Sequence, residues 1–304
     1  MLPIYLLNRL TMDIRKVQRT GDMHYVYLPT SWCKKQSIGS NSRVTLEQDA
    51  EGNLVVSPGI NEKKQKNLKL RLSEEDEKII HKLVISCYIN PLNSFVIHLE
   101  KGMDFTKLLN QKKLISLESV ELDKNTITCE STVSISDPAS LLKTMIRKIK
   151  NLLTIMEKNY NAELINRYEE EIDRNNLLIE KSTINSLTFN APSKLKTIEI
   201  YYISMIARDL ERLVDHIIGI DESEPKFIGE ISEVIDKLKE ILENTDNLSH
   251  KSAINFIKKT EELKDTPVKD LSTYGKKRIK DILSNISEVV MDWAITNDID
   301  KEKG

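Results

Sequence analysis

Two long helical patterns joined by a short turn constrain this fold more than any other feature. The patterns run from about Ala162 to Ile220, and the turn between them is Asn190-Ala191-Pro192-Ser193. Apolar residues recur at helical spacing on both arms. We therefore predict an antiparallel helical hairpin, around which the rest of the chain is organised.

Each arm of this hairpin carries two acids spaced four residues apart. They are Glu169 and Asp173 on the first arm, and Glu211 and Asp215 on the second. Such a pair shares one helix face, and because the pairs are symmetric about the turn, all four carboxylates fall at one height. Like charges this close repel, and a cation bound by carboxylate oxygens would relieve the repulsion. We expect these acids to hold a divalent or trivalent metal ion (Fe, Zn, Mn or Mg), although a solvated helix face also shows this pattern.

Two neighbours of these acids need partners. Asp209 falls in the apolar sector of its helix, where a charge is costly unless it is paired, and Arg212 or a metal could satisfy it. His216 follows Asp215 and is either a ligand or a side chain that packs the seam.

Composition limits the class of protein. The chain has 304 residues, a formal net charge of −2 and three widely spaced cysteines, which argues against a zinc knuckle or a disulfide framework. No apolar run approaches the roughly 20 residues that span a bilayer, and residues 1–10 lack a basic signal-peptide region. We expect two or three domains, no membrane insertion and a cytoplasmic location.

Residues 12–60 predict a small β domain. Strands are expected at Asp13–Gln18, Tyr25–Pro29, Arg43–Gln48 and Asn53–Ser57, with a helix at Thr30–Gln36 that Thr30 caps. This order resembles the AbrB/SpoVT swapped-hairpin domain, and the resemblance rests on Arg15-Lys16-Val17, Gly21, Val26-Tyr27-Leu28-Pro29, Arg43-Val44 and Leu54-Val55-Val56. The resemblance implies an interlaced homodimer.

The same domain has a local basic surface. Between Ile14 and Arg43 there are six basic residues and one acid, a balance that suits phosphate backbones. DNA binding and plain dimerisation both remain open interpretations. The candidate DNA-binding residues are Arg15, Lys16, Arg19, Lys34, Lys35 and Arg43.

Residues 61–136 predict an α+β connector domain. A strand at Leu68–Leu72 precedes a helix that begins with the capping-box pattern of Ser73 and Asp76 and ends at Ile89. A strand at Ser94–Leu99, a helix at Met103–Lys113 and strands at Ile115–Leu122 and Thr126–Ser134 follow. We find no phosphate-binding glycine loop or nucleophile motif in this connector.

Residues 137–304 predict an all-α bundle of two three-helix repeats. The first repeat begins with Asp137 as N-cap of a helix to about Tyr160. The second repeat has helices at Pro225–Glu243, His250–Asp265 and Lys276–Thr296. It carries the acid pairs Glu261/Asp265 and Glu288/Asp292, but its shorter arms predict a degenerate repeat that has lost its metal. The expected fold class is thus α+β multidomain.

The first repeat resembles a known family. The run Ala207-Arg208-Asp209-Leu210-Glu211-Arg212-Leu213-Val214-Asp215-His216-Ile217-Ile218 and the segment Glu169-Glu170-Glu171-Ile172-Asp173 are similar to the signature helices of PhoU phosphate-uptake regulators. The resemblance implies metal clusters on paired helices and binding to a phosphate-transporter ATPase or a signalling protein. Archaeal-type PhoU proteins with an AbrB-type head share this domain order.

Three functional hypotheses follow. The first is a PhoU-like regulator of phosphate uptake that acts by metal-supported protein binding, with DNA binding by its head as an open addition. The alternative is an AbrB-type transcriptional regulator whose helical domain senses a metal or metabolite. The third, a metal-dependent hydrolase, lacks a nucleophile or general base apart from His216, so we expect no catalysis.

Overall fold

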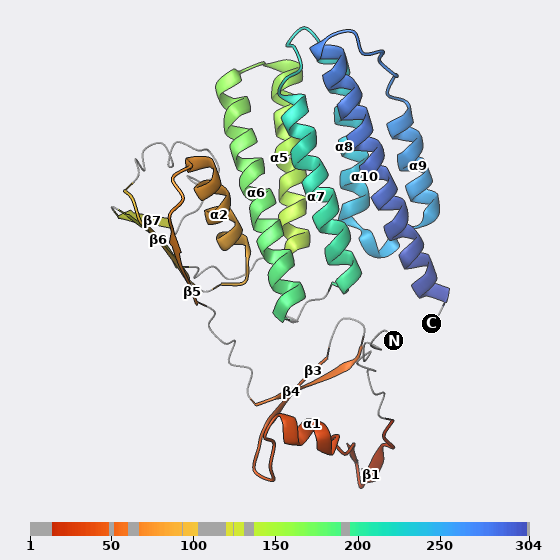
Figure 1. Ribbon diagram of the computed structural model, residues 1–304. Coiled ribbons are helices and arrows are strands. Elements are labelled where there is room, and N and C mark those ends of the chain that lie inside the picture. Colours follow the sequence, from red (N-terminus) through yellow and green to blue (C-terminus); the bar gives the residue numbers. More distant parts are fainter. Residues whose placement is uncertain are drawn as a thin grey trace, which may run out of the picture. The chain divides into compact units, whose positions relative to one another are not determined.

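The computed structural model divides into two compact units (Figure 1). The first contains residues 1–48 and 52–64, and the second contains residues 49–51 and 65–304. The expected helix at 103–113 and turn at 190–193 lie outside the described residues, and the three domain boundaries stay predictions. The structure describes residues 14–48, 52–59, 67–92, 94–102, 120–123, 125–130, 137–189 and 195–302.

The first unit consists of two antiparallel hairpins and one short helix. Strands β1 (Gln18–Thr20) and β2 (Met23–Tyr25) form one hairpin, and β3 (Val44–Gln48) and β4 (Leu54–Pro58) form the other. Gly21 has a φ of 62° in the first turn, a conformation that favours glycine. The first pair of strands is displaced from the ranges expected from sequence, whereas the second closely matches them.

Helix α1 (Thr30–Lys35) of this unit confirms the expected helix. The predicted cap is wrong, because Thr30 is already the first helical residue. The N-cap is Pro29, and no side chain caps the helix.

No described residue of the first unit is buried. Apolar side chains of its described residues are exposed instead. The exposed large apolar residues are Ile14, Val17, Met23, Tyr25, Val26, Tyr27, Leu46 and Leu54.

The second unit begins with a mixed sheet covered by one helix. The strand order is β5 (Asn67–Leu72), β6 (Ser94–Leu99), β8 (Thr126–Glu130) and β7 (Val120–Asp123), with β5 and β6 parallel and the others antiparallel. Helix α2 (Glu77–Ile89) connects the two parallel strands. Its cap is Asp76, which accepts hydrogen bonds from the amides of Lys78 and Ile79, rather than Ser73 as the sequence predicted.

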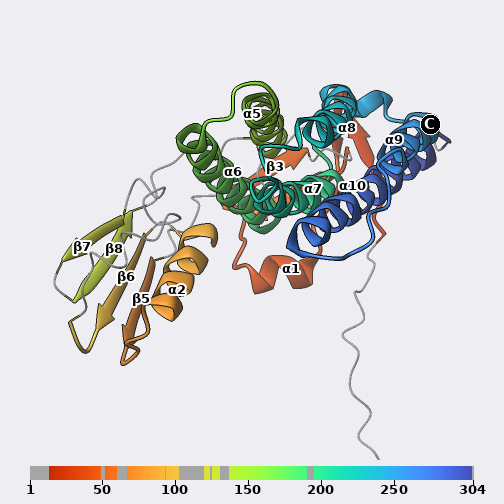
Figure 2. The ribbon, with the colours of Figure 1, turned by 90° about the horizontal axis from the view of Figure 1, so that it is seen from above.

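Six long helices form the rest of this unit (Figure 2). No helix in the described residues has the length and apolar content needed to cross a membrane. Asp137 accepts a hydrogen bond from the Ser140 amide at 3.0 Å, which confirms the predicted cap of the first helix. The helices are α5 (Pro138–Lys158), α6 (Ala162–Phe189), α7 (Thr197–Ile217), α8 (Pro225–Glu243), α9 (His250–Glu261) and α10 (Leu271–Glu302), with a short turn η1 (Thr245–Asn247) between α8 and α9.

The helices form two three-helix units, α5–α7 and α8–α10, which pack with like against like. Helix α5 contacts α8, and α7 contacts α10. In the first contact Lys150 Nζ lies 2.6 Å from Asp236 Oδ2. In the second, the Tyr202 hydroxyl lies 2.9 Å from Thr296 Oγ1, and Lys196 pairs with Asp300. These contacts show that α7 and α10 run antiparallel, and one continuous apolar core joins the two units.

Candidate metal site

The apolar stripe of α6 fixes how this helix is rotated in the bundle. Ile165, Ile172 and Ile179 are buried in the common core, so the acids beside them border the seam with α7. Helix α7 buries Leu210 and Val214 in the same core, which leaves Glu211 and Asp215 at the border of the same seam. The local sequence pattern thus brings acids of both helices to one place.

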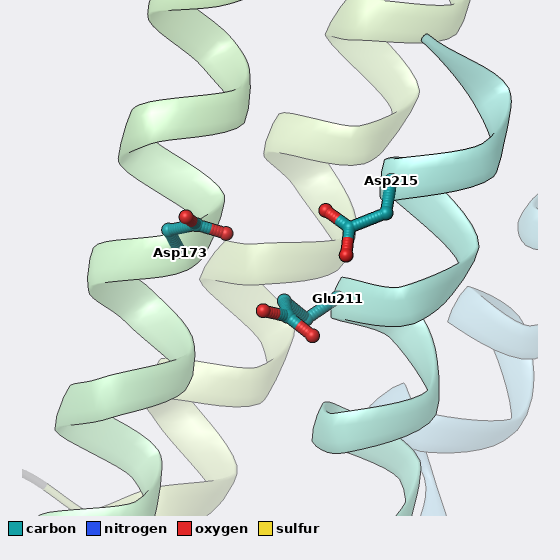
Figure 3. Close-up of side chains that lie close together, drawn as sticks. All are labelled: Asp173, Glu211 and Asp215. Carbon is teal, nitrogen blue, oxygen red and sulfur yellow. The ribbon is translucent and has the colours of Figure 1, made fainter. Parts of the chain in front are cut away.

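Three of the four predicted acids converge (Figure 3). Asp173 of α6 and Glu211 and Asp215 of α7 each offer a carboxylate oxygen, and these oxygens lie within 4.8 Å of one another. Asp173 and Glu211 are half-buried, and Asp215 is exposed. The register inferred from the sequence placed all four acids at one height, and in the structure three of them converge.

Glu169 and His216 lie outside this cluster. Glu169 is one turn before Asp173 on α6, and His216 follows Asp215; both are half-buried. Neither belongs to the group of described residues whose ligand atoms lie within 4.8 Å of one another.

The chemistry of the cluster suits a hard cation. Three carboxylates at this spacing repel one another, and a metal ion replaces that repulsion with attraction. Oxygen-only donors favour Mg, Mn and Fe, and Zn also accepts carboxylates.

Asp209 is satisfied by a side chain rather than by a metal. Its Oδ1 lies 3.1 Å from Arg212 Nη1, which is one of the two partners that the sequence allowed. Burial raises the pKa of Asp209, and the charge of Arg212 opposes this rise. The residue is therefore part of the packing of α7 and not of the acid cluster.

The second three-helix unit places its acids differently. Lys280 of α10 lies between Glu261 and Asp265, with Nζ 3.6 Å from Glu261 Oε2 and 2.7 Å from Asp265 Oδ1. Glu288 and Asp292 are exposed further along α10. The four acids therefore do not converge, which agrees with the prediction of a degenerate repeat.

The candidate DNA-binding residues are all exposed in the first unit. Arg19 donates to the Gly21 carbonyl at 2.8 Å and lies 3.5 Å from Asp22. The side chain of Arg19 is thereby held at the tip of the β1–β2 hairpin. The others are Arg15, Lys16, Lys34, Lys35 and Arg43.

The sequence did not predict a packing contact between the sheet and the bundle. Leu177 of α6 belongs to the apolar core of the sheet, and Lys181 Nζ lies 3.8 Å from the centre of the Tyr88 ring on α2. Lys181 is buried, and this burial lowers its pKa. Helical spacing from Leu177 to Lys181 was visible, but nothing in the sequence indicated a contact with α2. Helix α6 therefore contacts the sheet through the same helix that carries Asp173.

The site and the fold define a class of protein, namely a helical bundle with an acid cluster on one hairpin. Within this class, residues 135–222 of the chain match the family model of the PhoU domain. The matched segment contains α5, α6 and α7 and therefore the whole acid cluster. No match was found among curated proteins or solved structures.

Proposed function

We propose that this protein is a PhoU-like regulator of phosphate uptake that acts by binding and not by catalysis. The observation that carries the proposal is the acid cluster of Asp173, Glu211 and Asp215, which lies inside the segment that matches the PhoU domain. The cluster consists of carboxylates from two helices, which suits ligands of a cation rather than a pair of nucleophile and base.

The proposed ligand of the cluster is a divalent or trivalent metal ion, which joins α6 to α7. Asp173 and Asp215 are on different helices, and a shared cation therefore holds the hairpin together. Glu169 lies one turn before Asp173 on α6 and outside the converging group. The metal thus stabilises the surface that a partner recognises.

Elemental analysis of the purified full chain by mass spectrometry tests this proposal. We expect at least one metal ion per chain, and its loss in the Asp173→Asn/Asp215→Asn variant. The matched control is Glu261→Gln/Asp265→Asn, which removes two acids of the second three-helix unit, α8–α10, and should retain the metal. Equal metal content in the parent and the site variant, or none in the parent after purification without chelator, would overturn the metal proposal.

The proposed partner is the ATPase of a phosphate transporter or a signalling protein of the same system. Helix α6 carries Asp173 and also contacts the sheet through Leu177 and Lys181. Metal binding would therefore act on α6, a helix that packs both in the bundle and against the sheet with α2. Co-purification of the ATPase with the parent protein, and its loss with Asp173→Asn/Asp215→Asn, is the expected result, and equal co-purification with both proteins contradicts this step.

A second proposal concerns the first unit, which we infer to be an AbrB-type head that pairs two chains and contacts DNA. The supporting observation is that none of its described residues is buried while its apolar side chains are exposed. Tyr27, Trp32 and Val56 also line an open hollow of about 600 Å³. A second copy of the unit would supply the missing core.

DNA binding by this head is tested by its salt dependence. Arg15→Ala/Arg19→Ala should weaken binding to duplex DNA and lower the slope of log K against log salt by about 1 for each phosphate that the variant no longer neutralises. The control Lys237→Ala/Lys239→Ala removes two lysines from α8 and should leave the slope unchanged. Binding that is absent or independent of salt in the parent would reject the DNA interaction, whereas tight and sequence-selective binding would favour the transcriptional alternative.

A further inference from the structure

A buried amide of α6 lies one helical turn beyond the acid cluster. Asn176 follows Asp173 by three residues, and side chains at this spacing have Cβ atoms about 5–6 Å apart. Asn176 is only 8% exposed. Its Oδ1 atom is buried and accepts no hydrogen bond from any residue that the structure describes. Because a buried polar atom without a partner is costly, we expect this oxygen to have a ligand.

The neighbours of Asn176 show which way its side chain is directed. Asn175, the residue before it, faces α5, because its Oδ1 accepts a hydrogen bond from Lys148 Nζ at 3.1 Å. Ile172 is buried in the core of the bundle, and Asp173 faces α7 (Figure 3). Asn176 is four residues after Ile172 and three after Asp173, so it lies between the apolar stripe and the acids of α6. Its side chain is therefore directed into the seam between α6 and α7.

The contacts of α6 with α7 give the height of Asn176 in this seam. Asp173 lies at the level of the acids of α7. Further along α6, Glu180 meets Arg208, with Oε1 3.7 Å from Nη2. Asn176 is between Asp173 and Glu180, and the numbering of α7 falls as that of α6 rises. The part of α7 at the level of Asn176 is thus the turn that carries Glu211, a half-buried acid of the cluster.

Atom type and position distinguish Asn176 from Asn175 and Thr183. These two residues of α6 also have a buried polar atom without a hydrogen-bond partner in the described part of the chain. In Asn175 this atom is Nδ2, a donor that cannot bind a cation. In Thr183 it is Oγ1, which is ten residues and therefore about 15 Å along the helix from Asp173. Of the three, only Asn176 offers an acceptor oxygen on the turn next to the cluster.

We propose that Asn176 Oδ1 is a further ligand of the cation, a step that rests on the proposed metal site of Asp173, Glu211 and Asp215. Amide oxygens are ligands of hard cations, at distances of about 2.0–2.6 Å. The ion gives the buried oxygen its partner, and the amide adds a donor without adding a negative charge to the three carboxylates. The donor set is then built from oxygens of two helices, which suits Mg²⁺ and Mn²⁺.

Titration of the full chain with Mn²⁺ after treatment with a chelator tests the proposal. Calorimetry measures Kd for the parent and for Asn176→Leu, in which an apolar side chain of similar size replaces the amide. We expect Kd to rise about tenfold or more, because loss of a group that only orients a ligand already weakens metal binding about 10–100-fold. Asn176→Asp keeps an oxygen at this position and should bind Mn²⁺ more tightly than Asn176→Leu.

Asn175→Leu is the matched control. It makes the same change one residue earlier, at a side chain that is 4% exposed and bonded to Lys148 of α5. Its Kd for Mn²⁺ should stay close to that of the parent, because Asn175 faces away from the seam with α7. An equal loss of Mn²⁺ binding in both leucine variants would indicate a general disturbance of α6 and would overturn the assignment of Asn176.

Thermal unfolding separates a ligand from a residue that only packs. In chelator, Asn176→Leu should unfold at the same temperature as the parent or a higher one, because it removes a buried oxygen that lacks a partner. With Mn²⁺, the melting temperature of the parent should rise more than that of Asn176→Leu. Asn175→Leu should unfold at a lower temperature than the parent in both conditions, since Lys148 loses its hydrogen-bond acceptor.

The failure of this proposal and the failure of the metal site give different results. If the parent binds Mn²⁺ and Asn176→Leu binds it with the same Kd, Asn176 is not a ligand, and the site of the three acids stands. If the parent binds no Mn²⁺, the metal site is rejected and the role of Asn176 is rejected with it.

Discussion

The two three-helix units of the bundle share an arrangement of helices but hold their acidic residues in different ways. In α5–α7, carboxylate oxygens from two helices lie within 4.8 Å of one another. In α8–α10, Lys280 of the third helix lies between Glu261 at the end of α9 and Asp265 beyond that end. The acids of the first three-helix unit thus lie beside one another, whereas two acids of the second contact a lysine.

The difference arises from register. Helix α6 is long enough to place Asp173 opposite Glu211, whereas α9 ends at Glu261. Asp265 lies beyond the end of α9, and α10 begins at Leu271. Lys280 near the start of α10 is therefore the residue that lies beside Glu261 and Asp265, whereas Glu288 and Asp292 lie further along the helix. Where the first three-helix unit brings acids of two helices together, the second therefore has a contact between acids and a lysine.

The third helices also differ at equivalent positions. Trp293 follows Asp292 in α10, as His216 follows Asp215 in α7. The indole is 1% exposed and stacks on Tyr202 with ring centres 5.7 Å apart, whereas His216 is only half-buried. The second three-helix unit thus contributes the large Trp293 side chain to its contact with the first three-helix unit.

The substitution with the largest expected effect removes the contact of Trp293 with Tyr202. Trp293→Ala should lower the free energy of unfolding by about 3–5 kcal/mol, because it leaves a cavity in the core. His216→Ala is the matched change in the first three-helix unit and should lower the free energy of unfolding by less than about 1 kcal/mol. Urea unfolding followed by circular dichroism measures both, and equal losses would show that the two positions are equivalent.

A smaller effect tests the metal ion proposed for the first three-helix unit, α5–α7. At a metal concentration of 100 times Kd, the parent should gain about 2.7 kcal/mol in the free energy of unfolding. Asp173→Asn should lose this gain, while Glu261→Gln should keep it, since Glu261 pairs with Lys280. Thermal unfolding with metal and with chelator measures the gain, and an unchanged response in Asp173→Asn contradicts the site.

Asp209 predicts a change in the dependence of stability on pH. Burial raises the pKa of Asp209 in the folded chain, so the folded state favours the proton and this residue destabilises it as the pH rises from the ordinary aspartate range through the raised pKa. Asp209→Asn should remove that decline, and the variant should be as stable as the parent or up to about 1 kcal/mol more stable at neutral pH. Urea unfolding at several pH values measures this, and a variant that is less stable above the raised pKa would show that the Arg212 pair outweighs the burial.

The smallest effect concerns the internal cation. Lys280→Ala should cost only about 0.2–1 kcal/mol, because the side chains of Glu261 and Asp265 are 56% and 91% exposed. The variant should not acquire a metal, since Asp265 lies outside α9. Urea unfolding at low and high salt measures the loss, which should shrink with salt, and metal found by elemental analysis would contradict the explanation by register.

Sequence patterns determined most of the helical architecture. The helix expected at Pro225–Glu243 has the same bounds as α8, and the symmetry of the acid pairs predicted that acids of α6 and α7 meet, as Asp173, Glu211 and Asp215 do. Both are consequences of helical periodicity, which is a local property. The predicted strands and helix of the connector were found wherever the residues are described, apart from shifts at their ends.

Other features were decided only by tertiary structure. Lys280 is eight residues before Glu288 in the chain, and no local pattern shows that it meets Glu261 across two helices. The contact of Lys181 with Tyr88 and the stacking of Trp293 on Tyr202 also join distant segments. Such contacts depend on how rigid helices pack and on where each helix ends, and neither is encoded in the residues that make the contact. The sequence alone determined which faces of the helices carry acids and which are apolar, and packing decided which of those faces meet.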